Sequence, residues 1–470
     1  MRRATLAAFM AAGCLAALIS LPQTAGAGHR EKSEAGVPPS GRIEFTSSTL
    51  PLIVIDTEGR AIHDKSRIDA RMKVIGETGH ERNDLKTSPP TYTGHIGIEI
   101  RGQSSQDCPK KQYAFETRIG PNGSSREVPL LGMPAAAEWI LQGPCFDRSL
   151  LRNLLAYQLS NKMGRYAVRA RLVEAFIRER GTENPADHYR GVYVLMERIA
   201  RGPERVNVAA ASDRDPSGGY ILKIDKGEGP HVITAHGTKI LFVDPEKPSP
   251  AQKRYVRDYF DEFESALEEG GSDPEKGYPH SIDVDSFIDY FLLNELMKNV
   301  DAFRISTYMH KERGGKLEMG PVWDFDRSSG NIDSMGGNRP DGWYFTEKIS
   351  GFTVPFWWRR LVQEEAFRKR LSQRWKTLRQ DTLSDASITG IIDADLSRLK
   401  DAAERNFAVW PFLGSTQPPF NRDPKPSADY AGEIRELKDF LKARAAWMDD
   451  HVDTLGAAGA SPANRAQFHP

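Results

Sequence analysis

Apolar and polar positions divide the chain into a part with strand-like patterns and a part with helical spacing. Runs rich in β-branched and aromatic residues predict strands at 51–56, 71–76, 96–101, 112–118, 167–178, 189–198, 218–225 and 239–243. Helical spacing occurs at 150–163 and dominates from residue 249, first in a charged amphipathic segment at 250–269. We therefore expect an α+β fold, with a mixed or antiparallel β-rich N-terminal part and a helical C-terminal part.

A helix with Asp285 as its expected N-cap leads into a predicted hairpin. The run 304–310 is followed by Gly314-Gly315 and then by a second run at 316–323. Glycine accepts the positive φ angles of tight hairpin turns, so the two runs are expected to pair as antiparallel strands. Because the two arms have similar lengths, the chain should return to the end of the helix.

Three aspartates lie at the ends of this hairpin: Asp301 before it, and Asp324 and Asp326 after it. In a strand, alternate residues point to the same side, so the second and third carboxylates should face the first. Carboxylates gathered in this way repel one another unless a cation lies between them, which favours a divalent-metal site. The alternative is that Asp301 caps a turn and the other two form surface salt bridges.

A lysine and a glutamate in the β-rich part are further candidates. Lys111 ends a small and polar loop, 101–111, of a kind whose backbone amides suit a phosphate, although this signal is weak alone. Glu197 ends the strand run 189–198 on a face that is otherwise apolar, so its carboxylate needs a partner. Lys111 is a candidate for that partner, and a surface position at a strand end is the alternative.

The N-terminus has the features of an export signal. Arg2-Arg3 precede an apolar stretch at 4–21, and small residues at 25–27 form a cleavage pattern, so residues 1–27 are predicted to be a Sec-type signal peptide. A retained membrane anchor is the alternative. The polar, Pro/Gly-rich residues 28–45 are expected to be a flexible lead-in. No other segment approaches the ~18 apolar residues of a membrane span, so we expect none in the mature chain.

Composition narrows the range of partners. The chain has 64 Lys and Arg against 64 Asp and Glu, and removal of residues 1–27 takes away two arginines and no acids. A balance so close to neutral gives no case for nucleic acid. Of the three cysteines, Cys108 and Cys145 would remain in the mature chain. An even pair in an exported protein predicts a disulfide, with two separate core residues as the alternative.

A lysine, a glutamate and three aspartates suit phosphoryl transfer from a nucleotide, a reaction that needs mainly positioning and charge. Protein kinases also place one aspartate before a short hairpin and another after it, although the usual kinase signatures are missing here. Over roughly residues 50–360 the chain resembles the CotH family, the spore-coat-type atypical protein kinases. The resemblance rests on the motifs RGQSSQDCPKKQYAFE, LRNLLAYQLSNKMG, YRGVYVLMERI, GGYILKID, NVDAF and PVWDFD.

The resemblance implies an atypical protein-kinase-like fold, assigned to 46–380, that uses ATP with Mg²⁺ or Mn²⁺ to phosphorylate serine or threonine of exported or spore-coat proteins. A C-terminal helical extension at 381–455 and a disordered tail at 456–470 would follow. By position, the resemblance implies these roles: Lys111 binds phosphate, Glu197 is its acidic partner, Asp301 is catalytic, Asp324 is the main metal ligand and Asp326 assists it.

Three positions depart from the family pattern. Gln103 and Ser306 stand where relatives often have asparagine, and Lys223 stands where they tend to have an acid. The rival interpretation is a catalytically silent surface or adhesion protein on the same scaffold, since exported proteins meet little ATP. A metal-dependent hydrolase is a third option, but it would need histidines near the aspartates, and only His310 lies nearby in the sequence.

Overall fold

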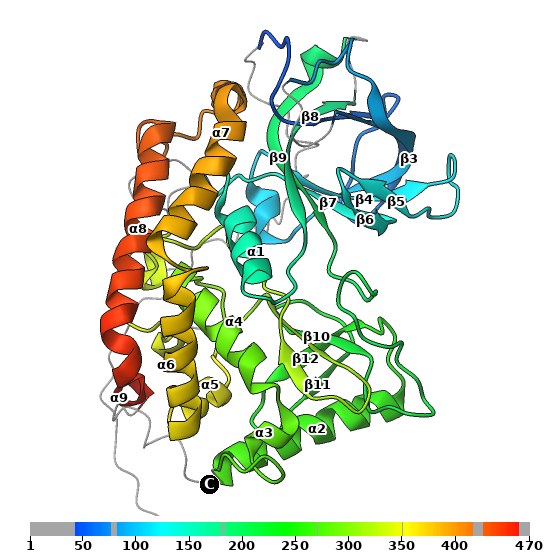
Figure 1. Ribbon diagram of the computed structural model, residues 1–470. Helices are drawn as coiled ribbons and strands as arrows, with labels where there is room; N and C mark the ends of the chain where they lie inside the picture. Colours follow the sequence, from blue (N-terminus) through cyan, green and yellow to red (C-terminus); the bar gives the residue numbers. More distant parts are fainter. Residues whose placement is uncertain are drawn as a thin grey trace, which may run out of the picture. The chain divides into compact units, whose positions relative to one another are not determined.

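The computed structural model describes residues 43–76, 82–179, 181, 184–269, 271–349, 351–416 and 426–459 (Figure 1). All of them belong to one compact unit, Glu34–Pro470. The predicted signal peptide, 1–27, and most of the predicted lead-in, 28–45, lie outside the described residues. Within the described part, no helix combines the length and the apolar character that crossing a bilayer requires. The molecule is α+β, β-rich in its N-terminal part and helical in its C-terminal part, as the sequence predicts.

Within the described residues, the N-terminal strands close into a barrel in the order β1-β2-β3-β4-β7-β9-β8. Its neighbouring strands are antiparallel, except that β1 pairs with β8 in parallel. Inward-pointing apolar side chains fill the barrel, among them Ile53, Ile96, Phe115 and Leu195. The strands are β1 (Leu52–Asp56), β2 (Ile68–Ile75), β3 (Pro90–Arg101), β4 (Gln112–Arg118), β7 (Glu138–Gln142), β8 (Ala170–Arg178) and β9 (Tyr189–Glu197).

A second sheet has the order β11-β12-β10-β13-β14. Its strands β13 and β14 form the predicted hairpin, with Met309 opposite Met319 and Lys311 opposite Leu317. The strands are β10 (Tyr220–Ile224), β11 (His231–Ile233), β12 (Lys239–Asp244), β13 (Thr307–Lys311) and β14 (Leu317–Met319). A separate two-stranded sheet consists of β5 (Val128–Leu130) and β6 (Met133–Ala136).

Helices make up most of the chain after residue 249. They are α1 (Arg152–Lys162), α2 (Pro250–Glu269), α3 (Tyr278–Ser281), α4 (Val284–Met297), α5 (Phe356–Leu361), α6 (Glu365–Gln380), α7 (Asp385–Val409), α8 (Tyr430–His451) and α9 (Leu455–Gly459). Short 3₁₀ helices lie at Ser104–Asp107, Pro185–His188, Ser334–Gly336, Tyr344–Thr346 and Val452–Thr454. The expected N-cap of α4, Asp285, is wrong: Asp283 caps the helix, and its carboxylate accepts from the Ser286 amide. Either aspartate satisfies the sequence pattern of a cap, and only backbone geometry distinguishes them.

The C-terminal helices pack against the rest of the unit. Helix α7 lies along β9, and α8 packs against α4. The latter contact contains an ion pair between Arg444 of α8 and Glu295 of α4, at 2.8 Å, with both side chains fully buried. The predicted tail, 456–470, begins inside α9, and its residues from 460 lie outside the described part.

Cys108 and Cys145 form a disulfide with a Cα–Cα distance of 6.5 Å, as the sequence predicts. Cys108 follows the 3₁₀ helix Ser104–Asp107, and Cys145 follows strand β7. The bridge therefore ties the polar loop before β4 to the end of a barrel strand. Both cysteines are buried in a small apolar cluster that also contains Trp410.

Candidate active site

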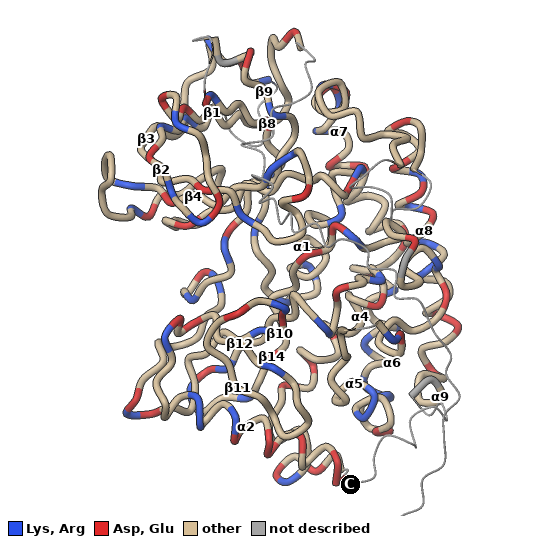
Figure 2. Tube along the Cα trace, turned by 180° about the vertical axis from the view of Figure 1, so that it is seen from behind, with Lys and Arg blue, Asp and Glu red and all other residues tan. Residues whose placement is uncertain are grey.

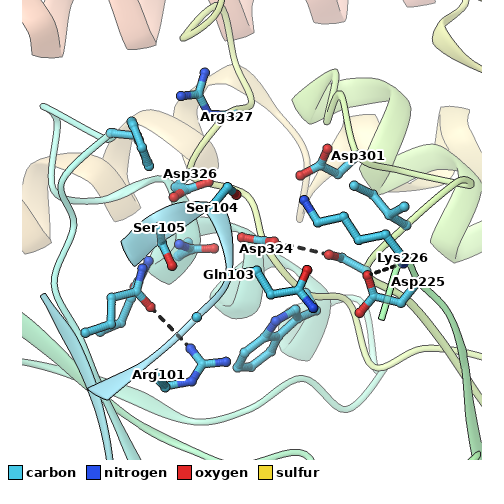
Figure 3. A pocket seen from close by; sticks show the side chains of 18 of the residues that line it. Arg101, Gln103, Ser104, Ser105, Asp225, Lys226, Asp301, Asp324, Asp326 and Arg327 are labelled. Carbon is cyan, nitrogen blue, oxygen red and sulfur yellow. Dashed lines mark hydrogen bonds between the residues drawn. The ribbon is translucent and has the colours of Figure 1, made fainter. Parts of the chain in front are cut away.

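A cavity of about 300 Å³ lies among residues of the barrel, of the second sheet and of the segment after the hairpin (Figure 3). The barrel contributes Arg101, the last residue of β3, and the loop that follows it, including Gln103. The end of β10 contributes Asp225 and Lys226. Each of the six motifs on which the sequence resemblance rests contributes at least one residue to the lining of this cavity.

The three aspartates predicted around the hairpin all line this cavity. Asp301 follows α4, whose C-cap, Lys298, adopts a left-handed conformation that turns the chain. Asp324 and Asp326 follow β14, where the chain has returned across the hairpin. Asp225, at the end of β10, is a further carboxylate of this cavity that the sequence argument did not single out. Its place at the end of the motif GGYILKID was an available signal.

Burial raises the pKa values of the three predicted carboxyls. It raises the pKa of Asp301 to about 7, with the charge of Asp324 as the second cause. Burial also raises the pKa of Asp324, although a hydrogen bond from the Ser306 hydroxyl, at 3.1 Å, opposes this effect. The pKa of Asp326 lies well above its ordinary value because of burial and of repulsion from Asp324. These side chains thus form a site of negative charge whose ionised forms would be stabilised by a cation.

Whether the cavity suits a metal ion depends on the donor atoms that its side chains offer. Carboxylate oxygens are the ligands that Mg²⁺ and Mn²⁺ prefer. Within the described residues, however, no group of three or more His, Cys, Asp and Glu side chains is arranged to hold a metal ion. Mg²⁺ is typically bound through one or two carboxylates plus waters and substrate phosphates, and two aspartates of this cavity fit that mode.

Four basic side chains line the same cavity: Arg101, Lys223, Lys226 and Arg327. In Figure 3, Lys226 extends toward Asp301 and Asp324, and its charge lowers the pKa of both carboxyls. Lys223 donates to Asp225 at 2.8 Å. Acidic and basic side chains therefore line one space, which suits a ligand that combines phosphates with a metal ion.

Arg101, Lys226 and Arg327 were not singled out from the sequence, and Arg101 has the best-defined contacts of the three. Its Nη1 donates to Gln112 Oε1 at 3.2 Å, and its guanidinium lies 5.8 Å from the ring centre of Trp323. Burial lowers its pKa, while the negative charge of Asp324 opposes that effect. Arg101 begins the motif RGQSSQ, so its place in a quoted motif was the available signal.

Lys111 and Glu197 do not line this cavity, and they do not pair. The Lys111 Nζ donates to the Gln106 carbonyl at 2.8 Å. Glu197 is fully buried, and its carboxylate pairs with Arg169 at 2.9 Å and with Arg205 at 3.3 Å. The expected pairing of Lys111 with Glu197 is therefore wrong.

Strand register explains why that pair is absent. Tyr113 of β4 lies opposite Leu141 of β7, which in turn lies opposite Leu195 of β9. Lys111 is consequently level with Tyr193, whose hydroxyl donates to the Lys111 carbonyl at 3.1 Å. Glu197 lies four residues farther along the strand, about 13 Å away at the rise of a β-strand.

Helix α1 holds the acidic segment in place. Asn153 Oδ1 accepts from the Phe325 amide at 2.7 Å. Phe325 stands between Asp324 and Asp326 in the sequence. Arg152, paired with Asp147 at 2.6 Å, donates to the Ser328 carbonyl at 3.0 Å. The motif LRNLLAYQLSNKMG thus contributes side chains that fix the backbone of the segment following the hairpin.

Backbone conformation at the site is unusual for residues with side chains. Asp324 has φ 67° and Ser306 has φ 51°, both in the left-handed region. Non-glycine residues occupy this region at a cost of about 1 kcal/mol or more, and such residues gather at functional sites. Here the left-handed conformations accompany the hydrogen bond between the two side chains.

Comparison with known proteins agrees with the geometry. The family model described as CotH kinase protein matches residues 98–448. The chain belongs to the CotH kinase protein family. The match runs from β3 to α8 and so includes every residue of the cavity. Comparison with curated proteins gives no match. Membership in the CotH family indicates a kinase-type function.

Proposed function

We propose that the chain is an exported, metal-dependent atypical protein kinase that transfers the γ-phosphate of ATP to serine or threonine of a protein substrate. The observation that carries this proposal is the convergence of Asp301, Asp324 and Asp326 on one cavity with four basic side chains. The exported location rests on the sequence of residues 1–27, and the ATP-dependent chemistry and the kinase-like fold rest on family membership together with this cavity.

Asp324 and Asp326 are the residues that would hold a divalent ion. When bound, Mg²⁺ or Mn²⁺ supplies positive charge against the phosphates and against the charge that develops on them. The raised pKa values of both carboxyls support this role, because a group that resists ionisation in the empty protein gains from an added cation.

Asp301 would act as the catalytic base. Its carboxylate accepts the proton of the substrate hydroxyl while that oxygen attacks the γ-phosphorus; the bond to the bridging oxygen breaks and ADP leaves. A pKa of about 7 suits this task, because a base works best when its pKa lies near the working pH. Lys226 extends toward the same carboxylate and can stabilise its ionised form.

Arg101 would take the phosphate-binding role that the sequence resemblance gives to Lys111. A guanidinium presents several donors in one plane and matches phosphate oxygens well. Lys111 would act as a positioning residue, because its Nζ holds the loop at Gln106. Glu197, in barrel strand β9, would likewise be a positioning residue, because its carboxylate forms ion pairs with Arg169 and Arg205.

The space available suits a nucleotide. A second cavity, of about 500 Å³, adjoins the first and shares Arg101, Lys223, Tyr308 and Trp323 with it. Together the two cavities fall in the range of small-molecule sites, about 300–1,000 Å³.

The test is transfer of labelled phosphate from ATP to a serine-rich protein by residues 28–470, with Mg²⁺ or Mn²⁺. Asp324→Asn should abolish transfer, whereas Asp301→Asn should abolish transfer and leave nucleotide binding intact. The matched control is Asp258→Asn on α2, an exposed aspartate far from the cavity residues in sequence. Equal activity of the wild type and the Asp324 variant would contradict the proposal.

One observation favours the alternative, a catalytically silent binding protein on the same scaffold. Lys223 stands where relatives tend to have an acid, and its ammonium neutralises Asp225 inside the cavity. A silent protein would show neither transfer nor metal-dependent nucleotide binding, and the same assays distinguish the two.

A further inference from the structure

A third cavity, separate from the two described above, lies on the outer wall of the barrel. It has a volume of about 590 Å³, and none of its lining residues lines the candidate active site. Strands β1, β2, β3, β4 and β8 provide its floor, and the first four of them are labelled at the upper left of Figure 2. We call this cavity the basic cleft, after the side chains that line it: Arg71, Lys73, Arg118, Arg126 and Arg178.

The register of the barrel aligns charged residues across the cleft. Each of five adjacent strands contributes one residue to a single row, whose members are Arg178, Asp56, Arg71, His95 and Arg118 in spatial order. At a strand spacing of about 4.8 Å, this row is about 19 Å long. A peptide in extended conformation covers that length with about six residues.

Positive charge exceeds negative charge in the cleft. Among the described residues that line it, five are Arg or Lys, and Asp56 is the one carboxylate. Asp56 pairs with Arg178, and Arg71 pairs with Glu58 at 3.2 Å on an exposed part of the surface. Lys73 and Arg126 are exposed and form no ion pair with a described residue. Arg118 pairs with Asp69 at 2.7 Å and with Glu116 at 3.1 Å. The positive charge that no described carboxylate offsets is therefore that of Lys73 and Arg126, and it points to an anionic ligand.

Apolar side chains make the cleft different from a simple anion site. Ile119 is 69 % exposed, the highest value among the exposed large hydrophobic residues of the described part. It lines the cleft together with Val54 and Leu85. An inorganic polyanion would leave these side chains in water, whereas a peptide with acidic and apolar residues would cover both kinds of surface.

We propose that the basic cleft binds an acidic, extended segment of a partner protein that also carries apolar side chains. Complementary charge would orient the segment and speed its association, and contact with Ile119 would add apolar burial. Because the cleft and the candidate active site have no residue in common, this proposal does not depend on phosphoryl transfer.

The test is fluorescence anisotropy of residues 28–470 with a labelled peptide made of Glu-Glu-Leu repeats. The informative variants are Lys73→Glu and Arg126→Glu, because neither side chain forms an ion pair with a described residue and the fold should tolerate the change. The matched control is Arg254→Glu, an exposed arginine on α2. Thermal melts of all variants verify folding.

The wild type and the Arg254 variant should bind the acidic peptide with equal affinity. Each cleft variant should bind it about tenfold more weakly, and salt at about 0.5 M should weaken all binding, as expected of a charge-driven contact. A peptide of Lys-Lys-Leu repeats should not bind. Unchanged affinity in both cleft variants, or no binding by the wild type, would overturn the proposal. Tighter binding of polyphosphate or of anionic lipid vesicles than of the acidic peptide would also overturn it, because the cleft would then serve a different class of ligand.

Discussion

At the scale of single residues, the candidate site is defined by the cost of placing carboxylates away from water. Asp301 has its pKa raised to about 7 by burial and by Asp324, so its ionised form is less stable in the folded protein than in the unfolded chain. Such a group leaves folding unaffected below its unfolded pKa of about 4 and destabilises the folded state as the pH rises toward 7.

Asp301→Asn should therefore stabilise the protein without metal, and more so at high pH. Thermal unfolding in the presence of a chelator should show a smaller difference in melting temperature between the wild type and the variant at pH 5 than at pH 8. At pH 8 the variant should be more stable by about 1 kcal/mol or more, because the wild-type carboxylate is then ionised in a buried site. A variant that is less stable than the wild type at pH 8 would show that Asp301 has a stabilising partner.

Residues brought together by local structure could be predicted, and those brought together by distant pairings could not. Asp301 and Asp324 meet because a short hairpin joins them, and that hairpin is encoded by two strand-like runs and a glycine turn. The prediction that Lys111 pairs with Glu197 was wrong because their relative position depends on the register of three strands that are far apart in the sequence. Arg101 was missed for the same reason.

At the scale of elements, α1 is the support for the acidic segment. Its Asn153 accepts from the Phe325 amide, and its Tyr157 lies against the Asp324 backbone and carboxyl. The sequence predicts this helix, but it contains no local signal for which backbone group Asn153 contacts, because the partner lies 172 positions away.

Asn153→Ala should weaken the site as well as the fold. Loss of the acceptor for a buried amide should cost about 1–3 kcal/mol of stability, measured by denaturant unfolding. The rise in melting temperature on addition of Mg²⁺ and ATP should also shrink, because Asp324 and Asp326 flank the freed amide. Gln158→Ala is the control on the same helix: its amide binds Asp395 of α7 at 3.0 Å, so it should lower stability and leave the Mg²⁺–ATP effect unchanged. Equal effects of both variants would contradict a specific role of Asn153.

Helix α8 is joined to α4 by the buried ion pair between Arg444 and Glu295. Arg444→Met would leave the Glu295 carboxylate buried without its cation, and this should cost about 3–5 kcal/mol of stability. Burial already raises the pKa of Glu295, so the loss should be smaller at pH 5 than at pH 8, where the unpaired carboxylate is ionised. Denaturant unfolding at the two pH values tests this, with the exposed Arg435→Met on the same helix as control. A loss that is the same at both pH values would mean that Glu295 finds another cation.

At the scale of the whole molecule, the division into a β-rich and a helical part could be predicted from periodicity, whereas the closed barrel could not. Closure depends on the parallel pairing of β1 with β8, for example Leu52 opposite Glu174, and no local pattern specifies a partner so far along the chain. The packing of α7 onto barrel strand β9 and of α8 onto α4 could not be predicted from the sequence either. It depends on buried contacts between distant residues, such as that of Lys110 Nζ with Asn406 Oδ1 at 2.7 Å.

The disulfide is a long-range tie that should affect the whole unit. It joins cysteines 37 positions apart, and reduction should lower the free energy of unfolding by about 2–4 kcal/mol. Non-reduced protein isolated after export should not react with a thiol-blocking reagent until it is unfolded and reduced. Reaction of both cysteines in the unfolded but non-reduced protein would show that the bridge does not form.

The central claim is that the cavity lined by Asp301, Asp324 and Asp326 binds a nucleotide together with a divalent ion. The most direct measurement is calorimetric titration of ATP into residues 28–470, with Mg²⁺ and with a chelator. We predict binding that requires Mg²⁺, that is lost in Asp324→Asn and that is retained in Asp258→Asn. Binding that is equally strong with the chelator and in the Asp324 variant, or absence of binding under all conditions, would contradict the account.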